Sequence, residues 1–154
     1  KKNQHVEIIE KNEKKNKFLK KNFPNINSFK NTKDLKKNSY DIIYETTGNT
    51  KLIENSYELI NDKGKLILIG VPKHNSKIKI NTLGINYGKK IIGSYGGNII
   101  PEKDIPKLVS LIKKNKINLR KLISGPYKFR NINTIINNIK TGKLITKPIL
   151  KLEH

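Results

Sequence analysis

The sequence predicts an α/β fold built on a doubly wound parallel sheet. The main reason is a set of three short β-branched runs that each stop at a glycine: Asp41–Asn49, Gly64–Pro72 and Lys89–Gly97. Short apolar runs bounded by Gly and Pro are typical of fully buried parallel strands. The carboxyl edge of such a sheet is where ligands bind, and glycines there let a ligand approach the backbone closely. The runs therefore also predict a ligand-binding edge.

The other elements follow from local patterns. Helix 11–22 has few apolar anchors and ends before Pro24, which cannot continue it. Helix 50–61 carries apolar residues at helical spacing and lies between Gly48-Asn49 and a turn at 62–64. Strands are predicted at 6–10, within 23–29, and at 41–45, 65–69, 90–94, 119–126 and 144–150; further helices are predicted at 102–114 and 132–139. Alternation of strand and helix predicts parallel pairing through right-handed crossovers.

Three segments have weaker patterns. Residues 31–37 predict a short polar helix or loop, and residues 83–87 a connecting turn. Residues 77–80 alternate polar and apolar, which indicates an edge strand or a surface segment. In the helix at 132–139, Ile135, Ile136 and Ile139 are expected to face a core, with Thr141-Gly142 as its cap.

Composition limits the function classes. The formal net charge is +21 and the pI is near 10.1, which invites a nucleic-acid interpretation. However, the lysines are spread along the chain and lack interleaved aromatic residues, so we interpret the charge as a solvated surface. No apolar run is long enough for a membrane span, and a cytoplasmic location is expected. The absence of cysteine excludes disulfides and thiolate metal sites in this chain.

In its order of motifs, the chain resembles the carboxyl-terminal half of the zinc-type medium-chain alcohol dehydrogenases. The resemblance is carried by residues 41–72, by Gly93-Ser-Tyr-Gly-Gly97 followed by Pro101–Val109, and by Thr141–Ile149. It implies that residues 1–95 are a partial, Rossmann-type NAD-binding domain without its first strand and glycine loop. Residues 96–151 would be a segment that returns to the catalytic domain, and residues 152–154 would begin a vector-encoded histidine tag.

The resemblance also implies cofactor-binding residues. Glu10 matches the acid that binds the ribose and favours NAD, although Lys11 and Lys15 beside it could instead favour NADP. The turn on the adenosine side is matched by Thr46, Thr47 and Gly48, and the turns near the nicotinamide by Gly70, Val71, Pro72, Ser94 and Tyr95. Lys147 matches a position that faces the pyrophosphate. The alternative for the turn residues is a tight strand exit that simply needs small side chains.

No catalytic or metal-binding residue is predicted within this chain. It contains no Gly-x-Gly-x-x-Gly loop, and by resemblance this loop and the zinc ligands would lie upstream. His5, His74 and His154 have no ligand spacing, and Asp41 and Glu45 lie at opposite ends of one strand, which disfavours an acid–base pair. The fragment alone is therefore expected to be inactive.

For the parent protein, the resemblance implies an NAD-dependent alcohol or polyol dehydrogenase that uses zinc. Its partners would be a small alcohol or aldehyde and a second copy of itself, paired through the strand at 89–94. A zinc-free NAD(P)H reductase of the same superfamily remains an alternative. So does a non-catalytic nucleotide-binding domain or a basic nucleic-acid-binding domain.

Overall fold

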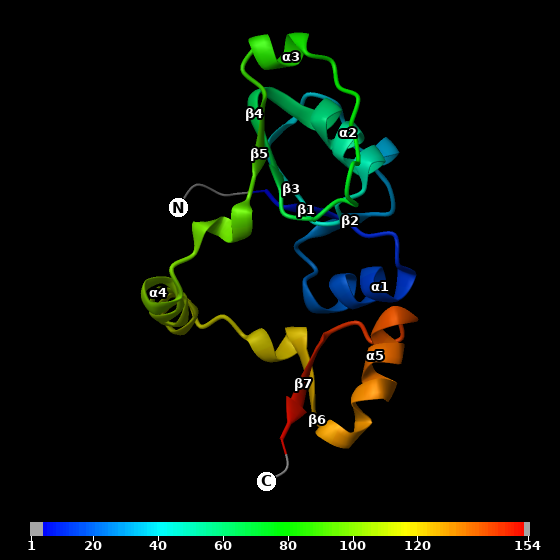
Figure 1. Ribbon diagram of the computed structural model, residues 1–154, viewed down its shortest axis with the longest axis vertical. Helices are drawn as coiled ribbons and strands as arrows, with labels where there is room; N and C mark the ends of the chain where they lie inside the picture. Colours follow the sequence, from blue (N-terminus) through cyan, green and yellow to red (C-terminus); the bar gives the residue numbers. More distant parts are fainter. Residues whose placement is uncertain (1–4, 153–154) are drawn as a thin grey trace. The chain divides into compact units, whose positions relative to one another are not determined.

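The structure, a computed structural model, describes residues 5–152 (Figure 1). The chain divides into two compact units. One unit comprises residues up to Lys30 together with those from Glu102 onward, and the other comprises Asn31–Pro101. Of the predicted tag residues, Glu153 and His154 lie outside the described part of the chain.

The unit Asn31–Pro101 is built on a three-stranded parallel sheet in the order β3-β4-β5. Its strands are β3 (Tyr40–Glu45), β4 (Ile60–Leu68) and β5 (Lys90–Gly93). Helix α2 (Thr50–Leu59) connects β3 to β4, and the short helix α3 (Leu83–Asn86) precedes β5. All pairings are parallel, which confirms that the three glycine-terminated runs lie side by side and point the same way.

Helix α2 covers one face of this sheet (Figure 1). Its amino end is capped by Asn49, whose side-chain oxygen accepts a hydrogen bond from the Leu52 amide at 3.1 Å. The buried cluster of this unit consists of Ile53, Tyr57, Ile60 and Leu66, with Ile43, Leu68, Ile78, Ile80 and Ile91 packed against it. Apolar residues of α2 thus pack with inward-facing residues of β3 and β4, and Ile91 of β5 packs against the same cluster.

The expectation that the three strands are fully buried is wrong for this unit. Residues alternate between the two faces of a strand, and α2 packs on only one of them. On the other face, Ile42, Tyr44 and Ile92 are exposed, Tyr44 by 61%. Continuous apolar runs predict burial on both sides, but burial also needs a second layer, which this unit does not have on that face.

One boundary in this unit differs from the prediction, and residues 77–80 adopt the second of their two predicted alternatives. Strand β4 begins at Ile60, directly after α2, because its first residues pair with Tyr40 before the register shifts. Residues 77–80 form no strand. They are a surface segment in which Ile78 and Ile80 turn towards the core, while the Lys79 amide donates to Glu54 at 2.9 Å.

One lysine departs from the solvated pattern expected of this basic chain. Lys89 is buried, and its ammonium group donates to the side chain of Asn38 at 2.8 Å. The same group lies 5.3 Å from the centroid of the Tyr57 ring. Lys89 therefore belongs to the interior of the unit, at the amino end of β5.

The other unit contains two parallel strand pairs. Strands β1 (Glu7–Ile9) and β2 (Asn27–Phe29) are connected by α1 (Glu13–Asn22). Strands β6 (Ile123–Lys128) and β7 (Lys147–Lys151) are connected by α5 (Ile132–Lys140). Each is a parallel strand–helix–strand unit, as the alternating pattern predicts. Strand β6 begins later than expected because Leu119–Leu122 form a 3-10 turn.

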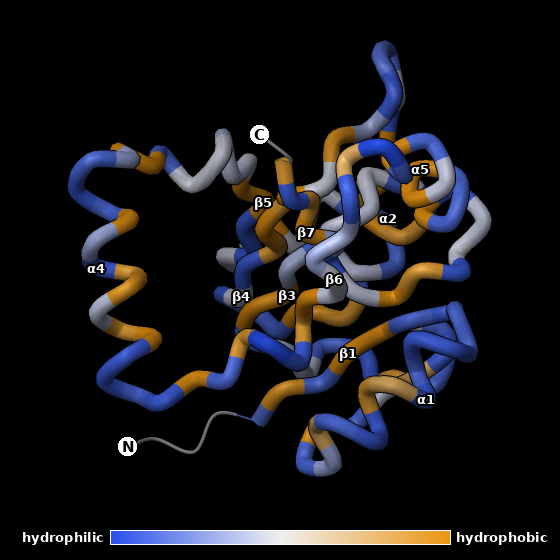
Figure 2. Tube along the Cα trace, turned by 90° about the horizontal axis from the view of Figure 1, so that it is seen from below, coloured by the Kyte–Doolittle hydropathy of each residue, from blue (hydrophilic) through white to orange (hydrophobic). Residues whose placement is uncertain are grey.

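Helices α4 (Pro101–Lys114) and α5 leave much apolar surface uncovered. Figure 2 shows apolar and polar residues alternating along α4, and no residue of α4 is buried. In α5 only Ile135 is buried, so the expectation for Ile136 and Ile139 is wrong: both are exposed. Thr141 and Gly142 do cap α5, because their amides donate to the carbonyls of Asn137 and Ile139. Within residues 5–152, no helix combines the length and apolar character needed to cross a membrane.

Candidate cofactor site

The carboxyl ends of β3, β4 and β5 meet at one edge of their sheet. In the strand register, Glu45 pairs with Leu68, and Leu68 pairs with Gly93, so all three strands end together. The Glu45 carbonyl accepts hydrogen bonds from the amides of Ile69 and Gly70 at 2.8 and 2.9 Å. The Ser94 amide donates to the Leu68 carbonyl at 3.0 Å. The three strand exits are therefore neighbours.

At Gly48 and Gly70, the backbone that follows β3 contacts the backbone that follows β4. A Cβ atom on Gly70 would lie 2.1 Å from the amide nitrogen of Gly48. A Cβ atom on Gly48 would lie 2.4 Å from the carbonyl oxygen of Val71, and Gly48 also has a φ of +69°. Both distances are far below any real carbon contact, so only glycine fits at either position. This contact agrees with the alternative of a tight strand exit that needs small side chains, and the close approach of a ligand to these glycines stays a prediction.

The buried carboxylate of Glu45 organises the turn after β3. Glu45 is 4% exposed. One of its oxygens accepts from the amide of Thr47, at 2.8 Å, and from the Thr47 hydroxyl. The other oxygen accepts from the amide of Gly48 at 2.9 Å. The Thr47 hydroxyl in turn accepts from the Asn49 amide at 3.0 Å, which connects the turn to the start of α2.

The outer surface of this edge is open to solvent. Val71 and Tyr95 are 89% and 92% exposed, and Thr46, Thr47 and Pro72 are exposed as well. After β5 the chain turns away through Tyr95, Gly96 and Gly97, all with positive φ. An exposed edge made of backbone, small side chains and apolar surface suits a flat, uncharged group that packs against it.

Eight of the ten predicted site residues share this edge. They are Thr46, Thr47, Gly48, Gly70, Val71, Pro72, Ser94 and Tyr95, and all belong to the unit Asn31–Pro101. The remaining two, Glu10 and Lys147, belong to the other unit. Their roles as cofactor ligands stay predictions.

Glu10 lies directly after β1, at the strand end where the sequence places it. Its backbone is held by Phe29, whose carbonyl accepts from the Glu10 amide at 2.9 Å, and by Asn16, whose side chain donates to the Glu10 carbonyl. One carboxylate oxygen accepts from the Asn12 amide at 2.8 Å, and the other lies 3.6 Å from the Lys15 ammonium. Glu10, which favours NAD, is thus ion-paired with Lys15, which could favour NADP.

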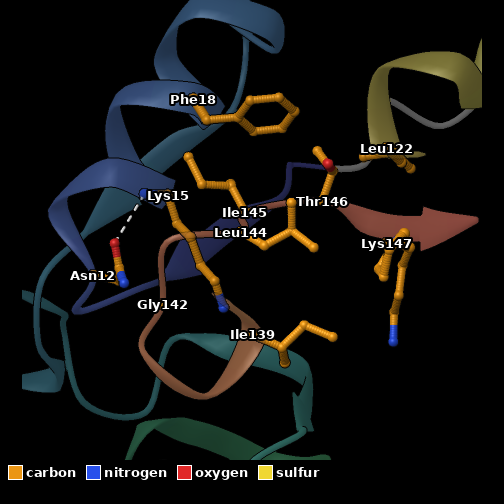
Figure 3. Close-up of a pocket in the computed structure, with 11 residues that line it drawn as sticks. Asn12, Lys15, Phe18, Leu122, Ile139, Gly142, Leu144, Ile145, Thr146 and Lys147 are labelled. Atoms are coloured by element: carbon orange, nitrogen blue, oxygen red, sulfur yellow. Dashed lines mark hydrogen bonds between the residues drawn. The ribbon is translucent and has the colours of Figure 1, made fainter. Parts of the chain in front are cut away.

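Lys147 lines a pocket of about 480 Å³ within its unit. Figure 3 shows Lys15 and Phe18 of α1 near Leu144 and Ile145, the residues that lead into β7. The pocket is also lined by Asn12, Leu122, Ile139, Gly142, Thr146 and Pro148. Its walls are mostly apolar, and its two lysines make it suitable for a ligand that carries negative charge.

The described residues contain no group of three His, Cys, Asp or Glu side chains that could hold a metal ion. Asp41 accepts from Asn61 at 2.7 Å at the amino end of β3, while Glu45 lies at the other end, so the two do not form a pair.

Sequence reasoning missed the role of Glu45. The signal was present, because an acid followed by Thr-Thr-Gly at a strand exit can accept hydrogen bonds from the turn after it.

Comparison with known proteins agrees with this geometry. The family model for zinc-binding dehydrogenases matches residues 5–114, which is more than half of the chain. The chain belongs to the zinc-binding dehydrogenase family. It is 27% identical over 121 residues to alcohol dehydrogenase 2 of Zea mays, and this match covers 78% of the chain and 32% of the relative. Alcohol dehydrogenase 2 of Oryza sativa subsp. japonica is 30% identical over 104 residues, which cover 67% of the chain and 27% of the relative.

Solved structures of related enzymes also match this chain. Benzyl alcohol dehydrogenase from Acinetobacter calcoaceticus has a TM-score of 0.66 and 27% identity, over 73% of this chain and 31% of its own. An acetophenone reductase from Geotrichum candidum, solved in complex with NAD, has a TM-score of 0.73 at 17% identity, over 95% and 41% of the two chains. The Rossmann-type fold is therefore confirmed, and the chain spans about a third of the length of the curated relatives that it matches.

Proposed function

We propose that the chain is the nucleotide-binding part of an NAD-dependent medium-chain alcohol or polyol dehydrogenase. The main supporting observation is the edge at which β3, β4 and β5 end together, with Gly48 and Gly70 in backbone contact. Such an edge is where α/β sheets bind dinucleotides. The parent protein would transfer hydride between the nicotinamide and the carbon of an alcohol or aldehyde.

Each of the two units has residues that we propose to contact NAD. At the carboxyl edge of β3–β5, the exposed Val71 and Tyr95 offer an apolar surface to a flat ring. In the other unit, the ion-paired carboxylate of Glu10 can accept hydrogen bonds from ribose hydroxyls, and Lys147 can lie against the pyrophosphate. NAD is the proposed cofactor because a carboxylate at Glu10 repels the 2′-phosphate of NADP.

The described residues of this chain offer no cluster of ligands for the catalytic zinc that we propose for the parent protein. We propose that the zinc ligands lie in a part of the parent protein that corresponds to the unmatched part of the relatives. We also propose that the chain alone does not oxidise alcohols. The segment 96–151 is proposed to belong to the catalytic domain, as the resemblance implies.

We further propose that the parent protein is a homodimer. Strand β5 pairs with β4 on one side, and among the described residues no strand pairs with its other side. An open edge is a ready template for pairing with a second copy. We also propose a small alcohol or aldehyde as the substrate, and the cytoplasmic location expected from the sequence stays a prediction.

A titration with NADH, followed by nicotinamide fluorescence, tests this function. Saturable binding of NADH, with weaker binding of NADPH, is the expected result. A parallel titration with duplex DNA at two salt concentrations provides the contrast, because DNA binding through phosphates weakens steeply with salt. Strongly salt-dependent DNA binding without any response to NADH would contradict the proposal and favour a nucleic-acid-binding domain. Tighter binding of NADPH would contradict the choice of NAD and indicate NADP as the cofactor.

A further inference from the structure

Glu45 is the buried carboxylate at the candidate edge, and neither the sequence nor the family match assigns it a role. We infer that Glu45 is a positioning residue: it holds the turn Thr46–Gly48 and the neighbouring exit of β4 in the shape that receives the dinucleotide. This inference rests on the proposed function. Glu45 itself does not touch the ligand in this arrangement, because its side chain is 4% exposed.

The hydrogen bonds of Glu45 connect two of the three strand exits. Its carboxylate binds the turn after β3 through the amides of Thr47 and Gly48 and the Thr47 hydroxyl. Its backbone carbonyl binds the exit of β4 through the amides of Ile69 and Gly70. One residue thus provides five acceptor contacts to the edge. Hydrogen bonds to a carboxylate are among the stronger ones in proteins, so the turn is fixed before any ligand arrives.

The same contacts define what the turn can offer a ligand. The amides of Thr47 and Gly48 point at the Glu45 carboxylate, so they are not directed at the solvent side of the edge. A phosphate-binding loop has the opposite arrangement, with its amides turned outward. The turn is therefore a wall against which an uncharged part of the dinucleotide packs, and it is not a phosphate cradle.

A requirement for a tight strand exit alone does not explain Glu45. Burying a carboxylate is costly unless several donors satisfy it, and a small polar side chain would suffice to start a turn. The exit of β5 at this edge is made without such an acid: Ser94 follows Gly93 there. The network is concentrated where Gly48 and Gly70 bring two backbones into contact, which is where a small displacement would close or distort the edge.

The decisive variant is Glu45→Gln. Glutamine can still accept from Thr47, but its amide group presents a donor to the Gly48 amide, where the carboxylate presents an acceptor. The turn should open at Gly48, and the affinity for NADH should fall by roughly tenfold. Glu58→Gln is the matched control, since Glu58 is a half-buried acid of α2 that lies away from the candidate edge, with its carboxylate 3.7 Å from the Lys37 ammonium. It removes the same charge and should leave the affinity unchanged.

Amide hydrogen exchange distinguishes positioning from general destabilisation. In Glu45→Gln, the amides of Thr47 and Gly48 should exchange faster, while the paired amides of β4 and β5 stay protected. Faster exchange throughout the sheet would contradict the inference.

The outcomes separate this inference from the proposed function. If the unchanged chain does not bind NADH, the proposed function fails. If the chain binds NADH and folded Glu45→Gln binds it equally well, the function stands and the positioning role of Glu45 is wrong. Should Glu45→Gln not fold, Thr47→Val and Thr47→Ser decide: Val removes the hydroxyl that donates to Glu45, and Ser keeps it. Because Thr47 is itself a candidate cofactor-binding residue, the readout is the exchange of the Gly48 amide: faster exchange in the Val variant alone supports the inference, and unchanged exchange in both variants overturns it.

Discussion

At the scale of single residues, the contact between Gly48 and Gly70 determines how closely the first two strand exits approach. We predict that Gly70→Ala is strongly disruptive, because the added methyl group would meet the backbone nitrogen of Gly48 at 2.1 Å. Neither backbone can yield without breaking the hydrogen bonds to Glu45. The free energy of unfolding should fall by more than about 2 kcal/mol, measured by urea denaturation.

Gly93→Ala is the matched control for this change. Gly93 ends β5 at the same edge, but a Cβ atom there would meet nothing within 4 Å. The stability of this variant should stay within about 0.5 kcal/mol of the unchanged chain. If the two variants lose equal stability, the close approach at Gly70 is not what makes glycine necessary there.

Tyr57 gives the chain a predicted sensitivity to alkaline pH. Its side chain is 1% exposed, and burial raises the pKa of the Tyr57 hydroxyl above its ordinary value of 10.0. Because the folded state has the higher pKa, the stability linked to this group is complete below pH 10.0 and is lost as the pH rises towards the folded-state pKa. The hydroxyl also donates to the Asn81 carbonyl at 2.9 Å.

Tyr57→Phe should separate these two effects. At neutral pH the variant should be less stable by about 1 kcal/mol, because the hydrogen bond to Asn81 is lost. Above pH 10.0 the deficit should shrink, since phenylalanine has no proton to lose. Urea denaturation at both pH values measures the difference between the two proteins, in which the titration of the many lysines cancels. A deficit that grows with pH would contradict the burial of a neutral hydroxyl.

At the scale of elements, the start of α2 depends on one side chain. Asn49 accepts from the Leu52 amide and lies directly after the turn that Glu45 holds. We predict that Asn49→Ala destabilises the unit by about 1 kcal/mol, because an amide at the helix start is left without a partner. Asn49→Asp keeps an acceptor and should retain the stability. Thermal melts followed by circular dichroism compare the three proteins, and equal midpoints for all of them would show that the cap contributes nothing.

Elements with a strong local signal could be predicted from the sequence, and elements that depend on tertiary contacts could not. The strands that end near Glu45, Leu68 and Gly93 were visible because β-branched runs and glycines are local features. For residues 77–80 the alternating pattern leaves an edge strand and a surface segment open, because strand pairing is a tertiary property, and the structure has the surface segment. The exposed Ile136 and Ile139 show the same limit: an amphipathic pattern does not say whether anything covers it.

The candidate site was predictable to a similar degree. Gly48 and Gly70 could be placed from the order of motifs, and the structure shows why only glycine fits. The acid before Thr-Thr-Gly signals a hydrogen-bonded turn at Glu45, but the number and identity of the donors appear only once the turn has folded back on the strand. Its position at the end of the strand was visible, but its burial at 4% exposure was not.

At the scale of the whole molecule, the charge of the chain is its dominant property. Its 33 Lys and Arg residues against 12 Asp and Glu residues give a formal charge of +21. Such an excess destabilises a compact state through self-repulsion. Exposed ion pairs such as Lys30–Glu13, at 2.8 Å, offset little of it, because pairs in water contribute roughly 0 to 1 kcal/mol.

We therefore predict that added salt stabilises this chain. Raising the ionic strength from about 0.01 M to 0.1 M shortens the screening length from roughly 30 Å to 10 Å, so distant lysines cease to repel one another. The melting temperature should rise with sodium chloride over this range and then level off. An uncharged solute at the same osmolality should not raise the melting temperature in the same way, since it leaves the repulsion between lysines unscreened. A melting temperature that falls with salt would show that attractive ion pairs outweigh the repulsion, which would contradict the interpretation of the lysines as a solvated and mutually repelling surface.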